Sequence, residues 1–160
     1  MTAPVALLVT GSRSLAKDPK AEAWARAILN PTIAELPPWS VVVHGGAIGP
    51  DRWAQESAEF HVRGVPLLTY VLFVDGEEWV VTLGAGLHVN RVRWTEAKNQ
   101  DPLVRNRHMV NVEMPALVAR GYEPRILALV DGTSRTRGAD HTVGLARKAG
   151  YPVDRRVWTP

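Results

Sequence analysis

Glycine, hydroxyl and arginine side chains gather in a few short stretches of the sequence, and the first follows an apolar run near the start of the chain. It contains Gly11, Ser12 and Arg13. Glycine lets the backbone approach a ligand closely, serine offers a hydroxyl group, and arginine binds a phosphate through two parallel N–H groups. The three residues therefore indicate an anion site, although a glycine turn beside a solvated arginine explains them equally well.

The second stretch runs from His44 to Asp51 and holds three glycines, Gly45, Gly46 and Gly49, within five residues. Such a backbone can wrap a ligand, but the stretch lacks the Gly-Lys-Ser/Thr of a Walker A loop and is not a strict G-x-G-x-x-G. Asp51 would either bind a ribose or a base, or favour the start of the helix that follows. We interpret His44 as a packed histidine at the end of a strand.

Two further stretches lie in the second half of the chain. Arg105 and Asn106 fall in the first turns of an expected helix, where a cation opposes the helix dipole and an anionic partner is therefore favoured. Arginines paired with nearby acids are the alternative. Ser134, Arg135 and Gly138 stand between an apolar run and another expected helix, a combination that favours phosphate binding at a helix N-terminus.

Three carboxylates accompany these stretches and are the candidates for a general base: Asp51, Asp131 and Asp140. Each is explained as well by a first-turn or turn position, so no catalytic residue is assigned. The histidines are dispersed, and no cluster of His, Asp and Glu has metal-ligand spacing, so we expect no metal site. A Mg²⁺ ion would arrive only as the partner of a bound nucleotide.

Apolar runs that end in glycine turns alternate with segments of helical periodicity, and this order places the four stretches between strands and helices. Strands without polar alternation indicate a mostly parallel sheet with helices on both faces, in which ligands bind beyond the carboxyl ends of the strands. Residues 71–74 and 79–83 predict a β-hairpin around Asp75-Gly76, followed by a loop to residue 100. The expected strands are 5–9, 41–43, 65–69, 126–130 and 153–158, and the expected helices are 20–36, 50–62, 102–113 and 139–149.

Length and composition describe an ordinary globular domain. The 160 residues suffice for one buried core, and 46% apolar with 22% charged residues argues against disorder. A net charge of +3 is too small to indicate nucleic acid by itself, and the absence of cysteine excludes disulfides and thiolate sites. The apolar run at residues 5–9 is too short for a signal peptide or membrane span, so we expect a cytoplasmic protein without membrane association.

The motifs together resemble the SLOG superfamily, specifically its YspA-like branch. The resemblance rests on V-T-G-S-R at residues 9–13, V-V-H-G-G-A-x-G-x-D-x-x-A at 42–54, R-N-x-x-M at 105–109, and D-G-x-S-R…G-A-x-x-T-V-x-x-A-x-x-x-G-x-P-V at 131–153. It implies a single Rossmann-like domain over residues 1–160, doubly wound, with about residues 70–93 as an inserted hairpin and loop. Related families include cytokinin-activating phosphoribohydrolases, a DNA-processing protein and nucleotide-derivative sensors.

The sequence departs from the phosphoribohydrolase branch at two positions. That branch carries P-G-G-x-G-T-x-x-E, and an alignment on Gly138 puts Ala139 at the threonine and Thr142 at the glutamate. Threonine cannot supply the carboxylate, which argues against phosphoribohydrolase activity. Ile48 stands where YspA-like loops usually carry an arginine.

Three functions follow from these patterns. The first is binding of a phosphate-bearing nucleotide or an ADP-ribose-like derivative, as in a sensor. The alternative is an N-glycosidic or phosphate-cleaving nucleotide hydrolase, in which arginines stabilise developing charge. The third is single-stranded nucleic-acid binding by the C-terminal arginines, with stacking on Trp79 or Trp94. The resemblance also leads us to expect a homo-oligomer.

Overall fold

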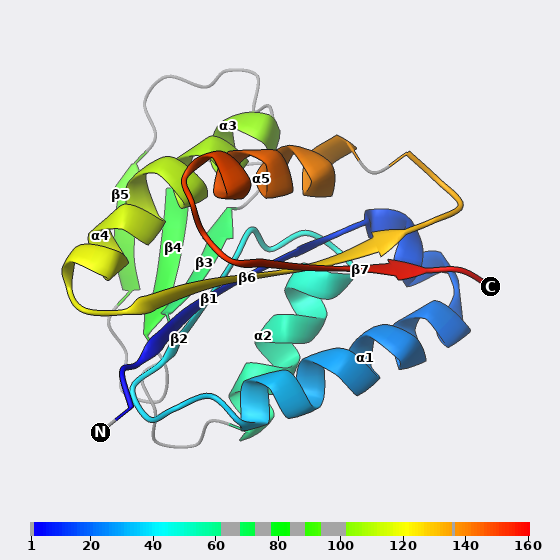
Figure 1. Ribbon diagram of the computed structural model, residues 1–160, viewed down its shortest axis with the longest axis horizontal. Coiled ribbons are helices and arrows are strands. Elements are labelled where there is room, and N and C mark those ends of the chain that lie inside the picture. Colours follow the sequence, from blue (N-terminus) through cyan, green and yellow to red (C-terminus); the bar gives the residue numbers. More distant parts are fainter. Residues whose placement is uncertain (1, 62–67, 73–77, 84–88, 94–101, 136) are drawn as a thin grey trace.

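A four-stranded, all-parallel sheet forms the centre of the computed structural model, which describes residues 2–61, 68–72, 78–83, 89–93, 102–135 and 137–160 (Figure 1). The strand order is β2-β1-β6-β7, so the first strand of the chain lies inside the sheet beside a strand from its last third. The strands are β1 (Val5–Gly11), β2 (Val41–His44), β6 (Glu123–Asp131) and β7 (Val153–Trp158).

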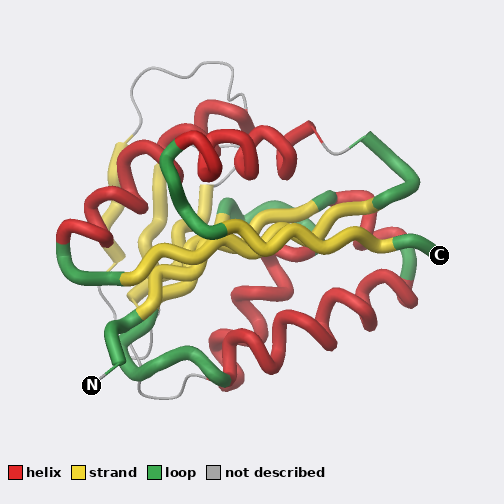
Figure 2. Tube along the Cα trace, viewed as in Figure 1, coloured by secondary structure: helices red, strands yellow, loops and turns green. Residues whose placement is uncertain are grey.

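Helices cover both faces of this sheet, as Figure 2 shows by the single layer of strands between two layers of helices. One layer holds α1 and α2, and the other holds α3, α4 and α5. No described helix is both long enough and apolar enough to cross a membrane. The helices are α1 (Pro19–Ala34), α2 (Pro50–His61), α3 (Pro102–His108), α4 (Met114–Ala119) and α5 (Arg137–Lys148), with a 3-10 helix at Arg13–Lys17.

The side chains of β1 explain why the strand needs a helical layer on each side. Val5, Leu7 and Val9 pack with α1 and α2, whereas Ala6 and Leu8 pack with α4 and α5. Successive side chains of a strand point to opposite faces, so an uninterrupted apolar run is buried only between two layers. The fold is therefore the Rossmann-like, doubly wound α/β fold that the sequence predicts.

A second, antiparallel sheet of three strands has the order β3-β4-β5, and β3 lies next to β2. Its strands are β3 (Leu68–Leu72), β4 (Glu78–Leu83) and β5 (Val89–Arg93). The predicted hairpin is confirmed by the pairing of β3 with β4, although its turn lies outside the described residues.

Two expectations for this segment are wrong. The described residues of the strand expected at 65–69 and of the hairpin arm expected at 71–74 belong to one strand over 68–72, because Thr69 and Tyr70 continue the strand instead of ending it. Residues 89–93 form a strand within the predicted loop, because β4 supplies a pairing partner that local polarity does not reveal. Residues 94–100 of that loop lie outside the described part of the chain.

The helix predicted at 102–113 continues to Ala119, and its hydrogen-bond pattern widens to a π-helix over Met109–Glu113. Pro115, which follows the predicted end of this helix, occupies the first turn of α4. Proline clashes with the carbonyl of the residue four positions earlier, and a π turn relieves that clash. The chain therefore passes Pro115 without leaving the helical path.

Candidate functional site

A cavity of about 580 Å³ lies at the carboxyl ends of β1 and β6, within the range of about 300–1,000 Å³ for small-molecule sites. The chain leaves β1 for α1 on one face of the sheet and leaves β6 for α5 on the other. Neighbouring strands whose connections diverge in this way create the crevice in which open α/β sheets bind ligands. Topology and cavity therefore indicate the same place.

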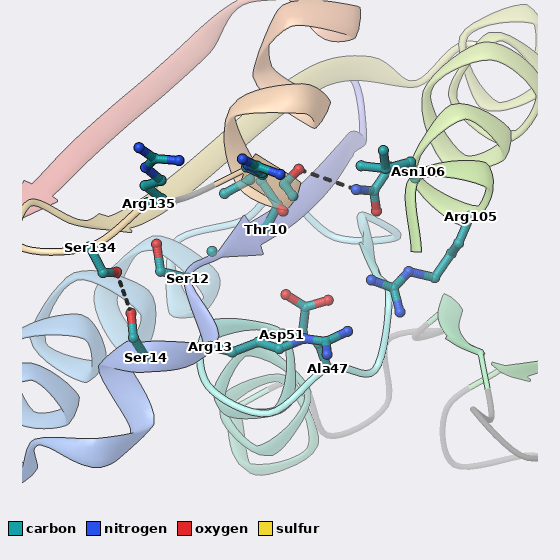
Figure 3. Close-up of a pocket in the computed structure, with 15 residues that line it drawn as sticks. Thr10, Ser12, Arg13, Ser14, Ala47, Asp51, Arg105, Asn106, Ser134 and Arg135 are labelled. Atoms are coloured by element: carbon teal, nitrogen blue, oxygen red, sulfur yellow. Dashed lines mark hydrogen bonds between the residues drawn. The ribbon is translucent and has the colours of Figure 1, made fainter. Parts of the chain in front are cut away.

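Most of the residues predicted for a ligand site meet in this cavity. Nine of them line it, namely Gly11, Ser12, Arg13, Asp51, Arg105, Asn106, Ser134, Arg135 and Gly138. The predicted residues that do not line it are Gly45, Gly46, Gly49, Asp131 and Asp140. Figure 3 shows the lining side chains, which come from the end of β1, the loops before α2 and α5, and α3.

Six lining residues were not among the predicted ligand contacts: Thr10, Ser14, Ala47, Leu103, Arg137 and Ala139. Most of them are next to a predicted residue in the sequence, so extending the predicted stretches by one residue would include them. Leu103 carries no such signal, because an apolar side chain at the start of a helix usually packs in the core. Only the fold places it beside the arginines.

Gly11 brings the end of β1 against α2 and β6. A Cβ atom added at Gly11 would lie 2.3 Å from Cγ of Pro50 and 2.5 Å from the carbonyl oxygen of Leu129. No side chain fits such distances, so this glycine is required by the close approach of the Pro50 ring and the β6 backbone to the end of β1.

The three glycines of the loop between β2 and α2 shape that loop without facing the cavity. Gly46 and Gly49 have φ values of 69° and 90°, which favour glycine strongly. At Gly45, an added Cβ would lie 2.5 Å from Nε of Arg105. The loop is therefore folded tightly against the Arg105 side chain, which reaches it from α3.

Arg105 is 7% exposed, and its Nη1 donates to the carbonyl oxygen of Gly45 at 2.9 Å. Burial lowers the pKa of Arg105, the negative charge of Asp51 raises it, and the positive charge of Arg13 lowers it further. The Nε–H group has no hydrogen-bond partner among the described residues. A guanidinium that lines the cavity with a second cation nearby is suited to an anionic ligand.

Asp51 is 4% exposed and lies at the start of α2, where its Oδ2 accepts a hydrogen bond from the N–H of Gly45 at 2.8 Å. Burial raises the pKa of this carboxyl, whereas Arg105, the N–H groups of Gly45 and Ala47, and Arg13 lower it. In Figure 3 the side chains of Arg13 and Arg105 approach Asp51 from different directions. The carboxylate thus lies in the electrostatic field of two arginines that line the same cavity.

Asn106 joins the two helices on the far side of the cavity. Its Nδ2 donates to the carbonyl oxygen of Gly138 at 3.2 Å, and the side chain is 3% exposed. Thr142 donates to the same carbonyl at 3.2 Å. These bonds fix the first turn of α5 at the rim of the cavity.

Asp131 ends β6 and is a hub of hydrogen bonds rather than a lining residue. Its Oδ1 accepts from the N–H and the hydroxyl of Thr133 at 2.8 and 2.6 Å, and its Oδ2 accepts from the hydroxyl of Ser14 at 2.7 Å. The hydroxyl groups of Thr133 and Ser14, followed by the Thr133 N–H and then by the Ser134 hydroxyl, lower the pKa of Asp131. Its own N–H donates to the hydroxyl oxygen of Ser12 at 2.9 Å.

Asp140 lies outside the cavity lining and pairs with Arg155, whose Nε is 3.0 Å from Oδ1. Both side chains are substantially exposed. Of the three carboxylates considered as a general base, Asp51 alone therefore lines the cavity.

His44 has the packed position that we expected. It is fully buried, its Nδ1 accepts from the N–H of Gly46 at 3.0 Å, and burial together with Arg105 lowers its pKa to about 3. It does not line the cavity.

Comparisons of the chain with protein-family models, with curated proteins and with solved structures found no match.

Proposed function

We propose that this protein binds a phosphate-bearing nucleotide or a nucleotide derivative such as ADP-ribose in the cavity at the carboxyl ends of β1 and β6, in the manner of a sensor. The observation that carries the proposal is the charge of the lining: among the described residues, four arginines surround a cavity that contains one carboxylate, Asp51. The arginines are Arg13, Arg105, Arg135 and Arg137. The resemblance to the YspA-like branch of the SLOG superfamily supports the same class of ligand.

Two helix N-termini add to this charge. α2 begins beside Ala47 and Asp51, and α5 begins with Arg137 and Gly138 at the rim of the cavity. Free N–H groups and the helix dipole make such ends favourable for anions. The arginines and the helix ends act on the same small volume, so a compact, multiply charged group such as a phosphate is the best match.

The proposal is tested by thermal melts with AMP, ADP, ATP, GTP, NAD, ADP-ribose, cyclic dinucleotides and oligo-dT. A ligand at about 100 times its dissociation constant stabilises the fold by about 2.7 kcal/mol, which raises Tm by roughly 5–10 °C for a domain of this size. We expect one class of nucleotide to give this shift. Arg13→Ala should weaken its binding by about 10- to 100-fold, the range for a charged hydrogen bond.

Arg147→Ala is the matched control, because Arg147 is also an exposed arginine but lies in the last turn of α5, away from the cavity. It should leave the shift unchanged. The absence of a shift with every nucleotide, together with salt-sensitive binding of oligo-dT, would overturn the proposal in favour of nucleic-acid binding. The C-terminal arginines suggested for that role already pair with carboxylates, Arg155 with Asp140 and Arg156 with Asp154.

Hydrolysis of the bound nucleotide is the second candidate, and the position of Asp51 favours it. This carboxyl lines the cavity, and its pKa is raised by burial, a shift that suits a general base. Chromatography of NAD, ADP-ribose and AMP after incubation with the protein would detect turnover. Product formation that Asp51→Asn abolishes, while the ligand-induced melt shift persists, would establish this activity; unchanged nucleotides would exclude it.

A further inference from the structure

Two serine hydroxyls on the cavity wall form a short chain that ends at Asp131. Ser14 donates to Oδ2 of Asp131 at 2.7 Å, and the oxygens of Ser14 and Ser134 lie 2.9 Å apart. Both serines line the cavity, whereas Asp131 lies behind them. The three residues come from the 3-10 helix after β1 and from the end of β6 and the loop after it, the two segments that meet at the crevice.

The protons in this chain point toward Asp131. Hydrogen bonds from Thr133, Ser14 and Ser134 lower the pKa of Asp131, so its carboxylate is ionised at neutral pH and can only accept. Ser14 has a single proton and gives it to Asp131. Ser134 therefore donates its proton either to Ser14 or to Asp131 itself.

Both hydroxyl protons thus form hydrogen bonds within the protein. Only the lone pairs of the two serine oxygens are left to bind a ligand. A phosphate oxygen also offers only lone pairs, so it cannot form a hydrogen bond with this wall. A sugar hydroxyl can donate to it. Ser12 differs, because its oxygen accepts from the N–H of Asp131 and its own proton remains available for a ligand oxygen.

The serine pair also lies apart from Arg105. In Figure 3, Ser14 and Ser134 stand at one side of the cavity with Arg135 nearby, and Arg105 and Asn106 stand at the other. A ligand that spans the cavity therefore meets the lone pairs of the serines at one end, while arginines are within reach from both ends. A molecule whose sugar hydroxyl faces the serines and whose phosphate reaches the arginines matches this arrangement.

We infer that the Ser14–Ser134 pair binds a ribose hydroxyl and that the site selects ribonucleotides over deoxyribonucleotides, with the phosphate left to the arginines. The inference rests on the proposed function, since it describes how a nucleotide would lie in the same cavity. It assigns to these two serines recognition of the sugar rather than of the phosphate.

The test measures dissociation constants by calorimetry for ADP and GDP, for their 2′-deoxy and 3′-deoxy forms, and for pyrophosphate. The wild-type protein should bind the ribonucleotides about 3- to 10-fold more tightly than one of the deoxy forms, the range for a single neutral hydrogen bond. Ser134→Ala should remove most of this preference without changing the affinity for pyrophosphate. Ser134→Thr keeps the hydroxyl and should keep the preference.

Arg135→Ala is the control for the charged part of the site, because it should weaken the ribo and deoxy forms by the same factor. Equal binding of ribo and deoxy forms by the wild-type protein would overturn the inference and leave the proposed function standing. Failure of ADP, GDP and pyrophosphate to bind, with no melt shift for any nucleotide, would overturn both.

Asp131→Asn provides a second test, because it replaces an acceptor oxygen at the end of the hydrogen-bond chain by a donor nitrogen. The two donors of Thr133 hold the remaining oxygen of the amide, so its nitrogen would face Ser14 and donate to it. Ser14 would then donate to Ser134, and the Ser134 proton would point into the cavity. This variant should lose the ribose preference and bind pyrophosphate more tightly; an unchanged preference in a folded variant would contradict the inferred proton order.

Discussion

His44 is fully buried at the end of β2, and its pKa in the folded protein is lowered to about 3 by burial and by Arg105. In the unfolded chain the imidazole titrates near its ordinary value of about 6.5. Between these two pH values the unfolded state binds a proton that the folded state excludes. The free energy of unfolding therefore falls as the pH decreases through this window. Above the window the titration of His44 makes no contribution to the pH dependence.

We predict that His44→Asn flattens this pH dependence. The wild-type free energy of unfolding should fall by up to about 1.4 kcal/mol per pH unit from this group below pH ~6.5. Asparagine does not titrate, and its Oδ1 can still accept from the N–H of Gly46. Urea unfolding of both proteins at several pH values gives the two slopes, and parallel slopes would contradict the burial of a neutral imidazole.

Several site residues could be predicted from their type and position. Arg105 opposes the dipole of the helix that it starts, and Ser12 and Arg13 follow a glycine turn at the end of a strand, where a solvated arginine was an equal alternative; all three line the cavity. The structural role of Asp131 could not be predicted, because its donor Ser14 lies far away in the sequence. The position of an aspartate in the sequence does not distinguish a carboxylate that accepts structural hydrogen bonds from one that acts as a general base.

Among the elements, α1 contains two prolines in different environments. Pro19 lies in the first turn, where its missing N–H group is not needed, whereas Pro31 lies inside the last turns and is exposed. Pro31→Ala should raise the free energy of unfolding, by up to about 3 kcal/mol, because the helix regains a hydrogen bond and loses a clash. Pro19→Ala is the matched control and should change stability little. Urea unfolding compares the two, and equal effects would contradict this account.

The elements that could be predicted are those whose burial is complete. Uninterrupted apolar runs identify β1, β2 and β6, and the alternation of strands with helices gives the doubly wound arrangement. β5 could not be predicted, because a strand without an apolar run of its own is specified by its partner rather than by its composition. The π turn before Pro115 likewise depends on packing that no local pattern records.

For the whole molecule, the cavity draws its walls from both helical layers, with α2 in one and α3 and α5 in the other. A bound ligand should therefore protect segments far apart in the sequence at the same time. We predict slower amide hydrogen exchange at residues 10–14, 45–51 and 132–139 when a nucleotide binds, and little change at the opposite ends of these helices. Exchange detected by mass spectrometry, with Arg13→Ala as control, tests this; protection of one segment alone would contradict a shared site.

The expected homo-oligomer stays a prediction that sedimentation can test.

The pairing of β1 with β6 has a consequence for synthesis of the protein. Val5 pairs with Glu123 and Gly11 with Leu129, so β1 gains one of its two neighbours only after the long segment between Gly11 and Glu123 has been made. Contacts between such distant residues form slowly, because the intervening chain must first be closed into a loop. Until then one edge of an apolar strand stays open to other chains, as in other slowly completed sheets. The arrangement that creates the crevice thus makes the nascent chain prone to aggregation and lets the ligand site form only after β6 has been made.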